Sequence, residues 1–291
     1  MAFGYKVLGF GSGGRVSPTY NIDYLIVAGG AGGGGLGSHG GGGGAGGMQT
    51  KTLSTQGEVV ITCGAGAAQR TTTFAGNGGA SEISGGVTTV TSAGGGGGAP
   101  GNNPNGLGND GGSGGGGGGS PSGASGGIGN TPSTSPSQGS DGGGANYSHP
   151  TYAAGSGGGH SVAPGISMNG GNGTADSITG TSVTYAGGGG GSAFTGAGPG
   201  GTGGGGAGAA PGGTSGGDGI DGLGGGGGGV SWGGGARGNG GSGGDGTVIL
   251  RVLTSDYAGG ATVTGGPTIT ADGAYTVLKW STGALTGTYV T

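Results

Sequence analysis

Few residues in this chain have the types and spacing that enzymatic or metal chemistry requires. The three histidines, His39, His149 and His160, lie far apart in the sequence, whereas a zinc site needs a clustered set of ligands. A Ser-His-Asp triad could be assembled only by choosing residues freely, because no strand–turn–helix elbow is present to carry the serine. We therefore predict no catalytic residue, no metal site and no cofactor, and we expect the protein not to be an enzyme.

One stretch does match a metal-binding motif. Residues 216–224 fit the nonapeptide G-G-x-G-x-D-x-U-x of calcium-binding repeats. The carboxylates of Asp218 and Asp221 would supply oxygen ligands of the kind that calcium prefers. Such sites are built by stacking tandem copies, and this chain contains a single copy. We interpret the stretch as a polar turn, with an isolated calcium site as the alternative.

The single cysteine, Cys63, is interpreted as a structural residue. It follows a β-branched run at 59–62, and in an alternating strand it shares one face with Val59 and Ile61. That position predicts a buried small side chain rather than a nucleophile. One cysteine also cannot form a disulfide within the chain.

A loop and two isolated aromatic residues could recognise a partner at an exposed surface. A loop at 146–152 carries rings with hydrogen-bonding tips between glycine blocks, a combination that suits a binding loop. An isolated phenylalanine and a tryptophan further along the chain suit the same role. The candidate recognition residues are Asn146, Tyr147, His149, Tyr152, Phe194 and Trp232. The alternative interpretation is that these rings cover the side of the molecule or form a subunit contact.

The elements that position these residues are dominated by glycine, which occupies 102 of 291 positions in contiguous blocks such as 32–35, 40–44 and 224–229. Collagen is excluded because the glycines do not fall at every third position. A disordered low-complexity chain fits the composition, but the low charge and the grouped β-branched runs oppose it. We predict a bundle of polyglycine II helices, in which backbones approach so closely that only glycine fits and backbone groups pair between neighbours.

β-strands are expected on both sides of this body, and no α-helix is expected because no window shows a 3.6-residue apolar period. The fold class is therefore all-β or irregular. We divide the chain into an N-terminal β anchor at 1–28, a glycine-rich body at 29–246 with interspersed strands, and a C-terminal β segment at 247–291. The expected strands lie at 5–10, 24–27, 48–53, 58–62, 87–91, 182–185, 247–253 and 275–280, with 285–290 able to form a hairpin back through Gly283.

Two junctions resemble a known family. An apolar strand runs directly into glycine at 24–30, and a glycine block runs directly into a strand at 240–251. This pattern resembles the glycine-rich domain of bacteriophage tail-fibre and other virion proteins, and the resemblance covers about residues 22–252. It is also similar to the tip adhesins of some T-even-type phages, whose polyglycine II bundle presents variable loops to the receptor. It implies no site residues, because those loops have no fixed motif.

From the resemblance we expect a virion protein that is made in the host cytoplasm and forms a homo-oligomer. Its terminal β segments would bind other virion proteins, and its loops would contact a host surface glycan or an outer-membrane protein. The leading hypothesis is a tail-fibre or tip component, and the alternative is a capsid decoration protein or head fibre. A soluble ice-binding protein and a disordered glycine-rich linker are further alternatives. Nucleic acid and membrane insertion are not expected, because the seven basic residues form no patch and no apolar stretch is long enough to span a bilayer.

Overall fold

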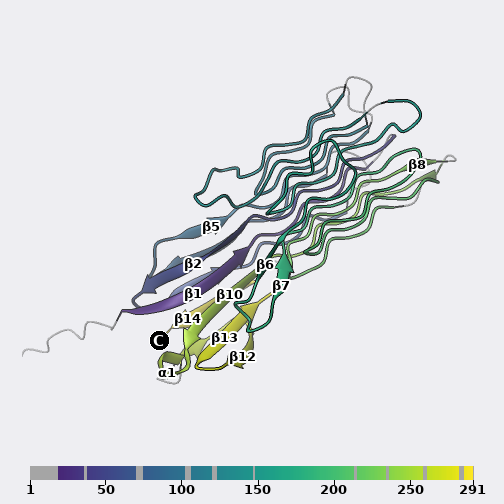
Figure 1. Ribbon diagram of the computed structural model, residues 1–291. Helices are drawn as coiled ribbons and strands as arrows, with labels where there is room; N and C mark the ends of the chain where they lie inside the picture. Colours follow the sequence, from purple (N-terminus) through teal and green to yellow (C-terminus); the bar gives the residue numbers. More distant parts are fainter. Residues whose placement is uncertain are drawn as a thin grey trace, which may run out of the picture.

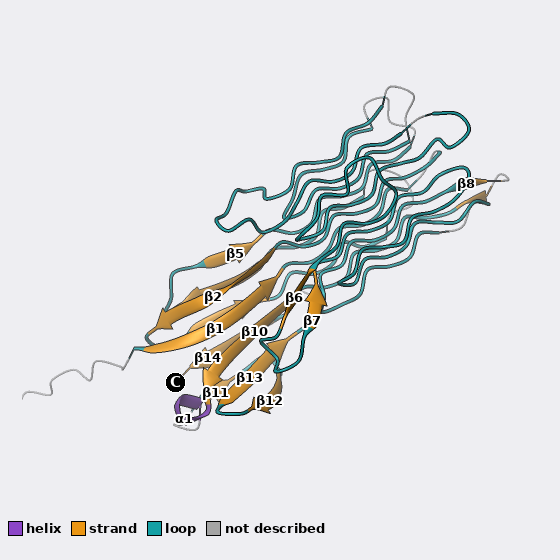
Figure 2. Cartoon of the chain, in the orientation of Figure 1, coloured by secondary structure: helices purple, strands orange, loops and turns teal. Residues whose placement is uncertain are grey.

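The computed structural model describes residues 19–35, 38–69, 75–101, 106–119, 123–146, 148–212, 215–233, 236–257, 261–281 and 285–290. Within these ranges the chain forms antiparallel sheets and irregular extended segments, with one four-residue helix. This finding confirms the predicted all-β or irregular class. The molecule is elongated, with a β-sandwich at one end and long segments that run side by side away from it (Figures 1 and 2).

The first sheet of the sandwich joins strands from both ends of the chain. It contains β1 (Tyr20–Val27), β2 (Met48–Thr55), β10 (Thr247–Leu253), β12 (Thr268–Asp272) and β13 (Tyr275–Trp280), in the spatial order β12-β13-β10-β1-β2. β1 pairs with β10 in a register that places Leu25 opposite Ile249. The expected strands at 247–253 and 275–280 are confirmed. A tight turn joins β12 to β13, with Gly273 at a positive φ of 59°.

The second sheet packs against the first. It contains β3 (Val59–Thr62), β4 (Ser81–Gly85), β5 (Val90–Ser92), β11 (Thr262–Val263) and β14 (Thr286–Val290), in the order β11-β14-β3-β4-β5. The expectation that 285–290 turns back as a hairpin is wrong, because β14 pairs with β3 and β11. The alternation of exposed and buried residues along β14 explains this pairing, since Tyr289 points into the space between the sheets and is fully buried there.

The main hydrophobic core lies between the two sheets. It holds Ile22, Tyr24, Ile26, Val59, Ile61, Cys63, Ile83, Val248, Leu250, Val252, Leu278, Trp280 and Tyr289. The prediction that Cys63 shares a buried face with Val59 and Ile61 is confirmed. β4 was not expected from the sequence, because a Ser-Glu-Ile-Ser-Gly strand carries only one large apolar side chain into this core. The expected strand at 5–10 lies outside the described residues.

A short hairpin covers the outer face of the first sheet, so β1 is buried on both faces. It consists of β6 (Thr174–Asp176) and β7 (Val183–Tyr185), and it forms a second core with side chains such as Leu25, Ile249 and Ile178. The Asp176 carboxylate accepts the Ile178 N–H at 2.7 Å, which holds the turn of this hairpin. The predicted strand at 182–185 corresponds to β7.

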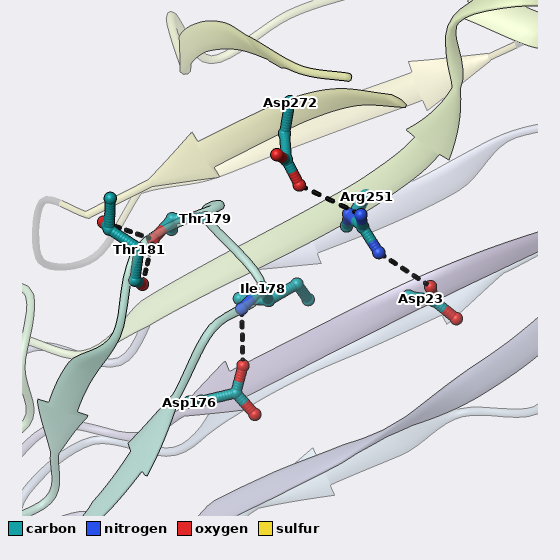
Figure 3. Close-up of polar contacts among 7 residues, drawn as sticks. All are labelled: Asp23, Asp176, Ile178, Thr179, Thr181, Arg251 and Asp272. Carbon is teal, nitrogen blue, oxygen red and sulfur yellow. Dashed lines mark hydrogen bonds and ion pairs between the residues drawn. The ribbon is translucent and has the colours of Figure 1, made fainter. Parts of the chain in front are cut away.

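Beside this hairpin, one cation links three strands of the first sheet. Arg251 of β10 lies 2.9 Å from the carboxylate of Asp272 on β12 and 3.8 Å from that of Asp23 on β1 (Figure 3). Its guanidinium also stacks 3.7 Å above the ring of Tyr275. Arg251 is therefore paired with two carboxylates within the sheet.

The helix α1 (Thr254–Tyr257) corrects the expectation of no helix. It is a single turn that follows β10, and its first N–H donates to Ala274 O at 2.9 Å. One turn is too short to show a 3.6-residue apolar period, so periodicity could not detect it. Among the described residues, no helix is long and apolar enough to cross a membrane.

The glycine-rich body continues directly from the strands of the sandwich and is held by backbone hydrogen bonds between segments. Along residues 28–34 the partner changes with a period of three. The first, fourth and seventh N–H groups donate to segment 41–47, the second and fifth to 76–79, and the third and sixth to 241–244, at 2.8–3.2 Å. Each segment therefore contacts several neighbours around its axis rather than two neighbours in one plane.

Interior segments are surrounded on all sides. Residues 40–47 donate to segments 93–99, 155–158 and 224–230, and they accept from 28–34, from 113–116 and from Gly189. A Cβ added to most glycines of this interior would overlap a backbone carbonyl of the next segment. The close approach of six backbones explains why the body tolerates almost no side chains.

Candidate functional site

The 146–152 loop lies at the end of the glycine-rich body farthest from the sandwich, which we call the tip. It joins two body segments, and its ends are tied by the bridge between Asn146 and Ala153. Inside the loop, the Tyr152 N–H donates to Ser148 O at 3.0 Å. The rings of His149 and Tyr152 meet edge to face at 5.7 Å. Of the loop candidates, Asn146 and His149 are exposed and Tyr152 is half-buried, while Tyr147 lies outside the described residues.

Phe194 belongs to the same surface. Its N–H donates to Thr151 O at 3.1 Å, which fixes it against the loop. Its ring remains 51% exposed and packs edge to face on His39 at 6.4 Å. The structure thus brings together Phe194 and the 146–152 loop, which are more than forty positions apart in the sequence.

Trp232 is carried to the tip by a second hairpin, β8 (Trp232–Gly233) and β9 (Ala236–Arg237), which Figure 1 shows at the end opposite the sandwich. The residues before it are anchored beside Phe194. The Ser231 hydroxyl donates to Ala193 O at 3.3 Å, and the Ser192 hydroxyl donates to Val230 O. The indole of Trp232 is 51% exposed, so it is available to a partner.

His39 was not predicted as a member of this surface. It is almost fully buried beneath Phe194, and its Nδ1 has no hydrogen-bond partner among the described residues. Burial lowers the pKa of its imidazole below the usual value. Its position between the glycine blocks 32–35 and 40–44 marks the turn of the chain at the tip, and this signal could have identified it.

A small hollow opens beside the loop, and sequence reasoning missed it. Its volume is about 240 Å³. It is lined by Gly144, Asn146, Thr151, Ala153, Ala154, Ile166, Ser167 and Met168. Ile166 is 75% exposed, an unusual position for a large apolar side chain that is not packed. No pattern in the sequence singled out 166–168, because isolated apolar residues in a glycine-rich stretch form no recognisable motif.

The acidic residues of the calcium-like motif have backbone partners. The Asp218 carboxylate accepts the Ser242 N–H at 2.7 Å, and the Asp221 carboxylate accepts the Asp245 N–H at 2.9 Å. These contacts satisfy N–H groups at the side of the body. In the described part of the chain, no three His, Cys, Asp or Glu side chains form a group that could hold a metal ion.

Cys63 and His160 also take part in internal packing. The Cys63 thiol donates to Trp280 O at 3.5 Å, and burial raises its pKa to about 11. The Nδ1 of His160 lies 2.6 Å from the Thr174 hydroxyl, and burial lowers the pKa of this imidazole. Neither residue faces the tip.

Comparison with known proteins gives one result. No curated protein and no solved structure matches this chain significantly. A family model described as a glycine-rich domain matches residues 14–253, which include the described β1, the whole glycine-rich body and β10. Because this match covers most of the sequence, the chain belongs to the glycine-rich domain family.

Proposed function

We propose that this chain is a non-enzymatic structural protein of a bacteriophage virion, a tail-fibre or tip component that contacts the host surface. One observation carries the proposal. The exposed aromatic residues Phe194 and Trp232 and the 146–152 loop gather at the tip, while the sandwich lies at the end opposite β8 (Figure 1). A module with an anchor at one end and exposed rings at the other suits attachment followed by recognition.

Polyglycine II helices are the conformation that we propose for the body. The three-residue period of hydrogen-bond partners along 28–34 supports this assignment, because that helix has three residues per turn and no internal hydrogen bonds. The six neighbours of segment 40–47 support hexagonal packing. Such a bundle would act as a stiff spacer, since every interior segment is bonded on all sides.

The sandwich is the proposed attachment end. Its first sheet exposes an edge strand, β12, on which four of five residues are exposed. An exposed edge can pair with a strand of another protein or of a second copy. Other virion proteins or sister chains would bind here, and the tip would then point away from the particle.

Cryo-electron microscopy of the phage particle whose genome encodes this chain tests the proposal. We expect density for the sandwich against the tail fibre or its end, with the 146–152 loop directed outward. Density on the capsid surface would instead assign a decoration protein or head fibre and would contradict a role in host contact. Absence of the chain from purified particles would overturn the virion assignment altogether.

A further inference from the structure

Several backbone groups at the rim of the hollow beside the 146–152 loop are already hydrogen-bonded within the protein. Asn146 and Ala153 exchange both backbone hydrogen bonds at 2.9 Å. The carbonyl oxygens of Ser167 and Met168 accept N–H groups from neighbouring body segments. These groups are occupied, and we look to the lining side chains for recognition of a ligand.

Three side-chain groups remain for that purpose. The Asn146 carboxamide accepts from Ser148, but its NH₂ group has no partner in the described part of the chain, and neither has the Thr151 hydroxyl. The Ser167 hydroxyl accepts the Asn169 N–H at 3.0 Å and keeps its own proton for donation. Amide and hydroxyl groups of this kind bind neutral hydroxyl and amide partners. None of the described residues that line the hollow is charged.

The remaining lining is apolar. Ala153 and Ala154 line its floor but are almost fully buried, whereas Ile166 is 75% exposed and Met168 is half-buried. This surface suits a methyl group, because burying it removes apolar area from water. The exposed ring of Phe194, bonded through its backbone to Thr151, offers a flat apolar surface next to the hollow.

Size narrows the choice of ligand. A hollow of about 240 Å³ is smaller than the roughly 300–1,000 Å³ typical of drug-sized ligands, so it accepts a single ring or the end of a chain. An N-acetylated sugar combines one ring with neutral hydroxyl groups, an amide and a methyl group.

We propose that this hollow is a binding subsite for an N-acetylhexosamine residue of a surface glycan. The acetamido methyl packs on Ile166 and Met168, and the acetamido and ring hydroxyl groups bond to Asn146 and Thr151. This inference rests on the proposed function of the tip, and it adds the class of ligand.

Calorimetric titration of the full chain tests the subsite, with the trisaccharide of N-acetylglucosamine as the probe. The de-acetylated glucosamine trisaccharide and a glucose trisaccharide are the comparison ligands. We expect the acetylated probe to bind at least about tenfold more tightly than either, since methyl contacts in an apolar pocket discriminate by that factor. Equal affinity for the acetylated and de-acetylated probes would overturn the proposal.

Two variants locate the binding to the hollow. Ile166→Ser removes an apolar contact, and Thr151→Val removes a hydroxyl at nearly constant shape. Both should weaken binding about tenfold. The matched control is Ile128→Ser, because Ile128 is 62% exposed but does not line the hollow, and it should bind like wild type. Unchanged affinity in Ile166→Ser would place the sugar elsewhere and refute the subsite.

A second measurement separates this inference from the proposed function. Binding of the fluorescently labelled chain to intact bacterial cells is measured with and without the acetylated trisaccharide. Competition by the sugar supports the subsite. Cell binding without competition overturns the acetamido inference and leaves the tip as a host-contact surface. Failure to bind either cells or sugar contradicts both.

Discussion

The Gly43 N–H donates to the carbonyl oxygen of Gly227 at 2.8 Å, although the two residues belong to glycine blocks that lie far apart in the sequence. The Gly227 N–H in turn donates to Ala31 O at 2.8 Å. Gly227 is therefore bonded to two different interior segments. This arrangement replaces a hydrophobic core with a backbone network, and its stability depends on the absence of side chains.

Replacing Gly226 and Gly227 by alanine should prevent folding of the body. A Cβ at Gly226 would overlap the carbonyl oxygen of Gly43, and one at Gly227 would overlap that of Gly241. Overpacking of this kind costs about 3 kcal/mol per site when the neighbours cannot move. Thermal unfolding followed by circular dichroism measures the loss.

Gly196→Ala is the matched control for that double variant. A Cβ at Gly196 would meet nothing within 4 Å, and its φ is not positive. It should therefore melt like wild type. If the double variant also melts like wild type, the 224–229 block is not an interior segment.

Asp218→Ala should destabilise the side of the body slightly, because the Ser242 N–H loses its acceptor. The site is exposed and water can replace the carboxylate, so we expect a loss of about 1 kcal/mol. Asp218→Asn keeps an acceptor oxygen and should lose less. Chemical denaturation of the three proteins measures the difference, and equal stability of the Ala and wild-type chains would show that the bond contributes nothing.

Removal of calcium should leave the melting temperature unchanged. Asp218 and Asp221 already accept backbone N–H groups, and we infer that their role is to satisfy those groups. Melting curves with a chelator and with added calcium provide the test. A calcium-dependent rise in melting temperature that is lost in Asp221→Asn would revive the calcium alternative.

Stability should fall in alkaline solution. Burial raises the pKa of Cys63 from its ordinary value of 9.0 to about 11. Burial, with a smaller contribution from the charge of Asp176, raises that of Tyr185 from 10.0 to about 12. The unfolded chain ionises first, so the stabilisation is present below about pH 9 and is lost as the pH rises to about 11 for Cys63. The loss from Cys63 amounts to about 3 kcal/mol.

Denaturation between pH 8 and pH 11 measures this dependence, and Cys63→Ala should show a shallower fall than wild type. In the native protein the thiol should also resist a disulfide reagent at neutral pH, because it is buried and protonated. Rapid labelling without unfolding would contradict the buried assignment.

The tip should become less stable in acid. Burial lowers the folded-state pKa of His39 below 6.5. The stability that the neutral imidazole contributes is therefore present above the pKa of the unfolded chain, and it is lost as the pH falls below about 6.5. Nuclear magnetic resonance of the imidazole should show a pKa below 6.5. His39→Leu should flatten the acid limb of the stability profile. An imidazole that titrates at its ordinary value would mean that the ring is open to water.

Several local features could be predicted from the sequence, because they depend on neighbouring residues. The β-branched run 247–253 and the alternating run at 275–280 formed the strands expected of them. Cys63 is buried because a strand alternates and Val59 and Ile61 fix the inward face. The contiguous glycine blocks predicted segments that pack backbone against backbone, because only such close contact favours long runs of glycine.

The tertiary structure alone decided which segments meet. All glycine N–H groups are chemically alike, so nothing in the sequence states that Gly43 pairs with Gly227 rather than with another block. The same packing gathered Phe194, His39 and the 146–152 loop at the tip and left a hollow beside Ile166. It also directed β14 to the second sheet, because Tyr289 could be buried there. These outcomes depend on contacts between distant segments, and local residue patterns do not encode them.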